Sequence, residues 1–399
     1  MSTQDAPSQR PVIVTGQQIG AGWSPALSVA KALAALAEAK RLGLEAVYWM
    51  ADEDHDRAEV AAAVGLENGR LIRHRFRFDA PEGTATGWLP WGPAQQREAE
   101  SLWGEVPLPA EPSLRGHTLA LGAPLWKLGL RPFSPTNPAL RDPIQCELER
   151  WRSLDLEADL LQSADRLRVE GAPLPLDPRQ QAAWFSLNPH TGLRKRLEPD
   201  DDCPKDHWLS PGAALRPLMQ SLLLPVEAAV LGPSERAYWR LTEPLWERVG
   251  LKAPRIIARP SVFVVPKGCT LKAEKLSDLA ALRDGHWQAF TTTKGKLPSE
   301  HLAPVPPNSS WGPLVGARFT KELDRTRHRL ERLDRRWLRD VAAHAFNMDP
   351  ERLRQQLFPF GKAQERLLPG LFWLQDESLI ERILEFMDED KSLILVEEA

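Results

Sequence analysis

The sequence has few cysteines and no long apolar run. Only three of its 399 residues are cysteine, Cys146, Cys203 and Cys269. An odd number this small does not make a disulfide framework, and it indicates a protein of the reducing cytosol. No apolar stretch approaches the roughly 20 residues that span a bilayer. The polar N-terminus also lacks the basic start and apolar stretch of a secretory signal. These absences predict a soluble, cytoplasmic protein without a membrane partner.

Neither positive nor negative charge predominates in the sequence. The chain has 51 basic and 54 acidic residues and a net charge of −3, so nothing global indicates a nucleic-acid partner. Proline, in contrast, is abundant. Its 36 residues predict many fixed turns and short elements. A chain of this length is expected to form two or three structural units.

Two segments have the pattern of strand, glycine loop, helix and strand. In the first, residues 11–15 and 45–50 predict buried strands, and residues 25–42 predict a helix with proline in its first turn that ends at Gly43. In the second, residues 224–231 and 254–265 predict strands, and residues 235–249 predict a helix that ends at Gly250. Such units give parallel strands with a right-handed crossover. We therefore expect an α/β fold in which both halves complete one sheet.

The remaining segments have weaker patterns. Residues 65–207 are rich in proline, glycine and tryptophan, and they predict a helix only over residues 138–168. An insertion between the halves of such a sheet usually supplies walls of a substrate site. Residues 319–341 predict a charged amphipathic helix, one arm of a short antiparallel pair. Residues 392–396 predict an edge strand.

The first candidate site is the loop after the first strand. Gly16 allows a tight turn whose backbone N–H groups, with the following helix, can bind a carboxylate or phosphate. Gln17 and Gln18 add neutral donors and acceptors that can orient an amide, a sugar hydroxyl or an amino acid. The glycine spacing fits neither a dinucleotide fingerprint nor a P-loop. A plain turn with solvated glutamines would explain these residues equally well.

The second candidate site is the acidic loop that follows the second strand. Four acids and a histidine lie at residues 52–56, and ligands of open parallel sheets bind beyond the carboxyl ends of strands. Crowded like charges raise carboxylate pKa values, and a histidine can titrate near neutrality. The cluster could hold an ammonium group, act as a general base toward an attacking amine, or bind Mg²⁺. The alternative is a solvated acidic loop. The predicted catalytic residues are Glu53, Asp54, His55 and Asp56.

A third loop follows the late strand. Ser234 is a good N-cap residue for the helix predicted there. Arg216 and Arg259 are candidates for bidentate binding of a carboxylate or phosphate. The spacing of Cys203 and His207 could bind a metal, but no second pair lies nearby, so we expect no metal site.

Motifs in three blocks, in order along the chain, resemble those of the BshC family, the bacillithiol-synthesis cysteine-adding enzymes. The sequences are VTGQQIGAGWSPALSVAK with VYWMADEDHDRAEV, then WLSPGAALRPLMQSLLLPVEAAVLGPSERAYW with APRIIARPSVFVV, and finally LFPFGKAQER. They extend from Val14 to Arg366. The resemblance implies a Rossmann-like parallel sheet related to class I aminoacyl-tRNA synthetases, with inserted connecting segments and a helical coiled-coil arm.

By motif position the resemblance also implies site residues and domains. The predicted substrate-binding residues are Gly16, Gln17, Gln18, Lys31, Arg216, Gly232, Glu235, Tyr238 and Arg259. The predicted nucleotide-binding residues, against the arm, are Lys362, Gln364, Glu365 and Arg366. The expected divisions are residues 11–64 and 208–265 for the two halves of the core, 65–207 for the insertions, 266–366 for the arm and 367–399 for the C-terminal segment.

The activity that the resemblance implies is the addition of cysteine to the amino group of glucosaminyl-malate. Because an amide forms from a carboxylate only after activation, we expect ATP as energy donor and no tightly bound cofactor. A homodimer through the arm is also implied, although this arm region is much shorter than is usual in the family. The competing hypotheses are a non-catalytic relative that binds a nucleotide or an amino thiol, and a nucleotidyltransferase acting on another small acid.

Overall fold

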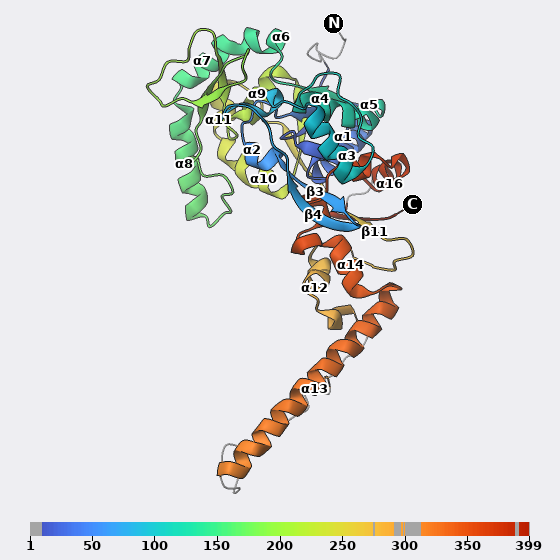
Figure 1. The fold of residues 1–399 in the computed structure, drawn as a ribbon. Coiled ribbons are helices and arrows are strands. Elements are labelled where there is room, and N and C mark those ends of the chain that lie inside the picture. The colour runs from blue at the N-terminus through green and yellow to red at the C-terminus, as the bar shows by residue number, and fades with distance from the viewer. Residues whose placement is uncertain are drawn as a thin grey trace. The chain divides into compact units, whose positions relative to one another are not determined.

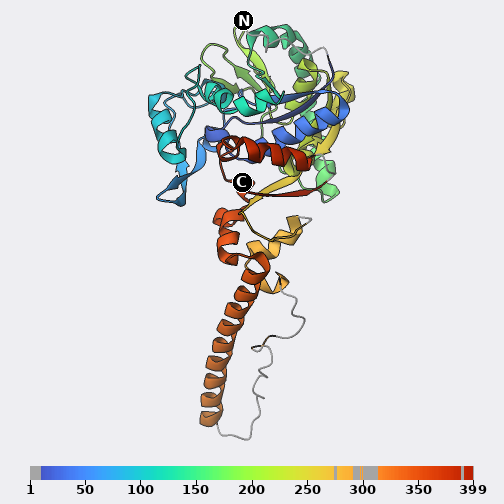
Figure 2. The same ribbon diagram turned by 90° about the vertical axis from the view of Figure 1, so that its right-hand side faces the viewer.

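The computed structural model describes residues 10–273, 276–290, 297, 299, 313–387 and 391–398, with only the backbone of residues 313–317. The chain divides into two compact units, each described below by itself. The first contains Met1–Val262 and Glu365–Ile394, and the second contains Phe263–Gln364 and Leu395–Ala399. Figures 1 and 2 show the ribbon in two views.

A five-stranded parallel sheet forms the centre of the first unit, in the order β10-β9-β1-β2-β5. The strands are β1 (Val12–Gln17), β2 (Glu45–Met50), β5 (Arg131–Phe133), β9 (Val226–Leu231) and β10 (Arg255–Ala258). The α/β, Rossmann-like fold expected from the sequence is therefore confirmed, and both predicted halves contribute to one sheet. The order turns around at β1, because β2 lies on one side of it and β9 on the other.

The helix between the first two strands covers this sheet. Helix α1 (Leu27–Leu42) has an alanine-rich, almost entirely buried surface, and it packs on β1, β2 and β9. It ends at Gly43, whose φ of 67° places it in the left-handed region that favours glycine. Pro25 precedes the helix rather than lying in its first turn, because Ala26 is the N-cap residue. Helix α16 (Glu377–Met387) lies beside α1 in Figure 2 and contacts it.

Two predictions about the second half were wrong. The helix expected over residues 235–249 is divided into α10 (Pro233–Trp239), η4 (Arg240–Thr242) and α11 (Leu245–Val249). Pro244 lies at the break, where its missing N–H cannot continue the helical hydrogen bonds. The segment 254–265 also does not stay in one sheet. After Pro260 the chain forms β11 (Ser261–Val265), which pairs with β12 (Leu393–Glu397) in a separate two-stranded sheet. The strand expected at residues 392–396 is confirmed as β12.

The inserted segments contain more structure than their periodicity predicts. A hairpin of β3 (Ala62–Glu67) and β4 (Arg70–Arg75) and a three-stranded sheet β7-β6-β8 were not expected. The single helix predicted over residues 138–168 is wrong, since Pro143 and Asp155, whose φ is 53°, interrupt it. Its pieces are α6 (Pro138–Arg141), η3 (Asp142–Ile144), α7 (Gln145–Ser153) and α8 (Leu156–Val169).

The other elements of the first unit are short. They are η1 (Ala21–Trp23), α2 (Arg57–Val60), η2 (Thr86–Trp88), α3 (Pro93–Trp103), α4 (Leu114–Leu121), α5 (Ala123–Lys127), β6 (Trp184–Leu187), β7 (Arg194–Arg196), β8 (Trp208–Pro211), α9 (Arg216–Leu223), η9 (Gln364–Arg366) and α15 (Leu371–Leu374). Element η9 begins with Gln364, which ends the first segment of the second unit.

The second unit contains the predicted amphipathic helix, confirmed as part of α13 (Pro313–Phe346). Near its C-terminal end one face is buried, through Leu338, Ala342 and Phe346. The unit also contains η5 (Leu276–Leu279), α12 (Ala280–Arg283), η6 (Trp287–Phe290), α14 (Pro350–Leu357) and η8 (Pro359–Gly361). Most of residues 291–312 lie outside the described part, so the antiparallel pair and the coiled coil stay predictions. Among the helices that the structure describes, none combines the length and the apolar character needed to cross a bilayer.

Candidate active site

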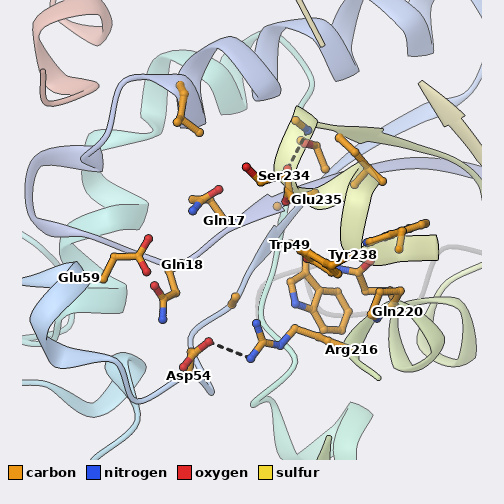
Figure 3. Close-up of a pocket in the computed structure, with 18 of the residues that line it drawn as sticks. Gln17, Gln18, Trp49, Asp54, Glu59, Arg216, Gln220, Ser234, Glu235 and Tyr238 are labelled. Carbon is orange, nitrogen blue, oxygen red and sulfur yellow. Dashed lines mark hydrogen bonds and ion pairs between the residues drawn. The ribbon is translucent and has the colours of Figure 1, made fainter. Parts of the chain in front are cut away.

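A cavity of about 720 Å³ lies at the carboxyl ends of the central strands, where the loops after β1, β2, β9 and β10 meet (Figure 3). It is centred where the strand order turns around, between β1 and β9. Ligands of open α/β sheets bind at this point. The first and second candidate loops thus face one cavity, as expected. The predicted site residues that line it are Gly16, Gln17, Gln18, Asp54, His55, Asp56, Arg216, Gly232, Glu235, Tyr238, Arg259 and Arg366.

Lys31 supports the first loop from below rather than lining the cavity. Its side chain is fully buried, and its ammonium group donates to the Gly16 carbonyl, to Gln17 Oε1 at 3.1 Å and to Glu235 Oε1 at 2.7 Å. Burial lowers the pKa of Lys31, while Glu235 opposes that shift. Lys31 therefore joins the loop after β1 to the helix after β9, so we assign it a supporting position.

The loop after β9 is held by Glu235. Its second carboxylate oxygen accepts the backbone N–H of Gly232 at 2.8 Å, and Gly232 is the N-cap residue of α10. The predicted N-cap role of Ser234 is wrong, because this residue lies one position inside the helix after Pro233. Tyr238, on the same helix, lines the cavity, and burial raises the pKa of its hydroxyl.

Glu53 is buried beneath the cavity and does not line it. Its carboxylate lies 3.0 Å from Arg141 Nη1 and 3.5 Å from Arg216 Nε, and it accepts a hydrogen bond from Ser210 Oγ at 2.9 Å. Burial alone would raise the pKa of Glu53, but the arginines lower it. The carboxylate therefore stays ionised. From its position beneath the cavity it holds the surrounding segments together.

Asp54 faces the cavity and is paired with arginine. Its Oδ2 accepts from Arg216 Nη2 at 2.9 Å, as Figure 3 shows, and Oδ1 lies 3.9 Å from Arg194 Nη1. Burial would raise the pKa of Asp54, but Arg216 and Arg194 hold it well below the usual range. Such a carboxylate is a weak base. It can orient Arg216 toward a ligand.

The ring of His55 is held by the buried side chain of Arg194, which comes from β7. The His55 Nδ1 atom lies 3.3 Å from Arg194 Nη1. Because a guanidinium only donates hydrogen bonds, Nδ1 must be the acceptor, and the neutral ring then carries its proton on Nε2. Burial and Arg194 lower the pKa of His55, although Asp54 and Asp56 oppose them. At neutral pH this histidine is a hydrogen-bond donor at Nε2 rather than a base there.

The remaining acids of the loop have separate functions. Asp56 is the N-cap residue of α2, and its Oδ1 accepts the Glu59 N–H at 3.0 Å. Asp52 is fully buried and lies 3.6 Å from Arg115, with hydrogen bonds from Ser134 and Thr136. Burial raises the pKa of Asp52 to about 6. Among the described residues, no cluster of three or more His, Cys, Asp or Glu is placed to hold a metal ion.

The C-terminal motif is divided between the two units. Glu365 is buried and forms a bidentate ion pair with Arg259, at 3.0 and 2.9 Å, beside the cavity. Arg366 is exposed and lines the cavity. Gln364 is buried in the second unit, where it donates to the Val264 carbonyl at 2.9 Å, and Lys362 is exposed there. The predicted nucleotide-binding residues therefore do not all face one described cavity, and this role stays a prediction.

Sequence reasoning missed several residues of the site. Arg141 and Arg194 come from the inserted segments, and no local spacing marks them as partners of the acidic loop. Glu59 and Trp49 also line the cavity. Glu59 lies only three residues after the acidic loop, on the short helix α2 that Asp56 caps. This closeness in sequence could have indicated Glu59 as a site residue.

Comparisons with known proteins find one matching family and several relatives. The family described as "Bacillithiol biosynthesis BshC, N-terminal Rossmann-like domain" matches residues 201–260. The chain is 28% identical over 425 aligned residues to a protein of Thermus thermophilus, covering 94% of this chain and 85% of that protein. The corresponding protein of a second strain of that species matches equally, and one of Koribacter versatilis is 29% identical over 66% of this chain and 56% of its own length. All three are named "Putative cysteine ligase BshC".

Over most of its length the chain is similar to proteins of the BshC family. The matched residues 201–260 include Arg216, the loop after β9 and Arg259. This part of the chain provides one side of the cavity. The acidic loop after β2 also lines the cavity, and its Asp54 pairs with Arg216 of the matched segment.

Replacing Glu53 by Gln should destabilise the protein strongly. The substitution leaves Arg141 fully buried without its carboxylate partner, and breaking a buried ion pair from one side costs about 3–5 kcal/mol. Denaturant titration measures this loss. Glu38→Gln is the matched control, since it removes an exposed pair with Arg41 and should cost less than about 1 kcal/mol. Equal stabilities of the two variants would contradict the organising role of Glu53.

The ring nitrogens of His55 should report the contact with Arg194. In ¹⁵N–¹H correlation spectra at pH 7, we expect neutral His55 with its proton on Nε2, and Arg194→Gln should weaken this preference. The lowered pKa means that His55 protonates only at a pH below the range of an ordinary histidine. A His55 signal that titrates above the range of an ordinary histidine, or a proton on Nδ1, would be incompatible with the hydrogen bond.

Proposed function

We propose that this chain is a ligase that joins the carboxyl group of L-cysteine to the amino group of glucosaminyl-malate in bacillithiol biosynthesis, through an activated acyl intermediate. The observation that carries the proposal is the cavity at the turning point of the sheet order, which is lined by both acids and arginines in a chain similar to BshC proteins. Its volume of about 720 Å³ suits small-molecule substrates.

The distribution of charge supports an acceptor with two kinds of group. Asp56 and Glu59 lie on the side of the cavity formed by α2, where an ammonium group would be stabilised. Arg259 and Arg366 lie on the side formed by β10 and the C-terminal motif. Glucosaminyl-malate has an amine on its sugar and carboxylates on its malyl part, so it could bind with each group near the opposite charge.

Two donors remain for an anionic group on the arginine side. Arg259 pairs with Glu365 through both terminal nitrogens, but its buried Nε has no hydrogen-bond partner among the described residues. A buried donor without a partner costs free energy that a ligand oxygen could recover. Arg366 is exposed, and the described residues show no ion pair for it. We infer that these two arginines hold a carboxylate or phosphate of the substrates.

The first loop would position the activated acyl group. Lys31 fixes the Gly16 carbonyl and the Gln17 side chain, so the loop is rigid before a ligand binds. The neutral His55 ring can donate from Nε2 to an oxygen on which negative charge develops, as a preorganised donor does in acyl transfer. ATP is the proposed energy source, because a free carboxylate does not form an amide without activation.

Purified protein supplied with cysteine, glucosaminyl-malate and ATP should form the cysteinyl amide, together with an equal amount of AMP or ADP. Mass spectrometry of the product and chromatography of the nucleotides measure both. Omission of cysteine is the control, since a nucleotidyltransferase would release pyrophosphate without it. Binding of the substrates without product or nucleotide turnover would instead identify a non-catalytic relative and end the ligase proposal.

Replacing Arg366 by Gln should raise the KM for glucosaminyl-malate by about 10-fold or more, with a smaller change in kcat, because the lost contact forms with bound substrate before and during reaction. The residue is exposed, so the fold should persist. Arg97→Gln on α3 is a matched control, since this exposed arginine does not line the cavity. Unchanged steady-state kinetics in the Arg366 variant would remove this residue from the substrate site.

A further inference from the structure

The side chains around the cavity differ sharply in their ability to accept a proton. Four carboxylates line it, those of Asp54, Asp56, Glu59 and Glu235. A reaction in which an amine attacks an acyl group needs a base, because an ammonium group has no free electron pair. The hydrogen bonds of each acid decide which of them is available.

Two of these four carboxylates already form ion pairs with cationic side chains. Asp54 accepts from Arg216 at 2.9 Å, and Glu235 accepts from Lys31 at 2.7 Å and from the Gly232 N–H at 2.8 Å. A carboxylate that is stabilised as an anion by such partners is a poor proton acceptor. His55 is also unsuitable, since its Nδ1 accepts from Arg194 and its Nε2 carries a proton.

Glu59 is in a different situation. Figure 3 shows its carboxylate near Gln18, extending toward the open part of the cavity. In the described part of the chain, no hydrogen bond or ion pair of this carboxylate is observed, and the backbone N–H of Glu59 donates to Asp56 Oδ1 at 3.0 Å. That hydrogen bond keeps the Asp56 carboxylate close to the first turn of α2.

The charges around Glu59 favour a bound cation. Glu59 is exposed to the cavity, and its partial loss of solvent together with the negative charges of Asp56 and Asp54 raises the pKa of its carboxyl. Arg216 from α9 and Arg194 from β7 point to Asp54 instead. Arg57, on the same helix, donates to the carbonyls of Ala80 and Pro81. Strand β3, which packs against α2, has only uncharged residues before its last, Glu67.

We propose that Glu59 binds the ammonium group of the acceptor and takes a proton from it, as the general base of the ligation. This inference rests on the proposed function. Asp56 contributes charge but also caps α2, so its part is secondary. Glu59 is neither in the acidic motif predicted from the sequence nor among the residues that the family resemblance carried over.

The chemistry balances without a further group. One proton passes from the ammonium nitrogen to the Glu59 carboxylate, which leaves a neutral amine with a free electron pair. The amine attacks the carbonyl carbon of the activated cysteinyl group, an acyl phosphate or adenylate formed from ATP. The C–N bond forms and the C–O bond to the phosphate breaks. The second proton on nitrogen leaves to water, and Glu59 returns its own proton to solvent.

The test compares Glu59→Gln, Glu59→Asp and wild type over pH 6–9. At pH 7 the Gln variant should lose about 10²- to 10³-fold in kcat, as expected when a general base is removed. This loss should become smaller as pH rises, because the acceptor ammonium group then loses its proton to solvent without help from Glu59. Glu59→Asp should recover part of the rate. Glu82→Gln is the matched control, as Glu82 is exposed and lies outside the cavity.

Calorimetry separates this inference from the proposed function. At pH 6.5, Glu59→Gln should weaken binding of glucosaminyl-malate about 10-fold but leave binding of its N-acetylated form unchanged, because that form has no ammonium group. If wild type forms product and Glu59→Gln stays within threefold of it at every pH, Glu59 is not the base and the ligase proposal stands. If wild type neither binds glucosaminyl-malate nor turns over, both proposals fail. A pH-independent loss of rate in a folded variant would assign Glu59 a structural role and overturn the inference.

Discussion

The candidate site depends on the burial of one carboxylate, that of Glu53, between Arg141 and Arg216. A fully buried ion costs several kcal/mol unless it is paired and hydrogen-bonded. Each partner therefore fixes its own segment against the loop after β2: Arg141 comes from the inserted region, Arg216 from α9, and Ser210 from β8. The parallel sheet places the strand ends at one edge. The ion pair between Arg141 and Glu53 in addition holds the inserted segment at that edge. The same network lets Arg216 reach Asp54 at the floor of the cavity, so the stability of this region and the shape of the site have one physical origin.

A second ion pair, between buried Lys31 and half-buried Glu235, connects the two sides of the turning point of the sheet. It connects the helix after β1 to the helix after β9, and Thr15 Oγ1 adds a hydrogen bond to the Val230 carbonyl at 2.9 Å. Because of these two ion pairs, the polar residues of the motifs have different roles. Glu53 and Lys31 organise the loops, while Asp54 orients an arginine. The groups that remain available to a ligand are few, and they lie on opposite sides of the cavity.

The strands and the first helix could be predicted because their signals are local. Apolar runs gave β1, β2 and β9, and Gly43 and Gly250 marked the helix ends where a left-handed φ is needed. The loops after these strands could be predicted to converge, since parallel strands end at one edge. The three-residue strand β5 contains a proline and has too few residues for any period, and the hairpin β3–β4 is largely exposed. Arg141 and Arg194 could not be found from the sequence, because a charge pair between distant segments leaves no trace in local spacing.

The charge balance beneath the cavity makes a densely acidic loop compatible with the acidic substrate that we propose. Glu53 and Asp54 carry two negative charges, and Arg141, Arg194 and Arg216, all largely buried, carry three positive ones. With His55 neutral, these five side chains carry a net positive charge, although the sequence of the loop after β2 is strongly acidic. Buried charges are screened less than exposed ones, so the excess acts on a ligand in the cavity. Negative charge that is not compensated by an arginine is left at the α2 side, with Asp56 and Glu59. A ligand with one cationic and one anionic end is therefore oriented by the field before any specific contact forms, which places its amine where a carboxylate is free to accept a proton.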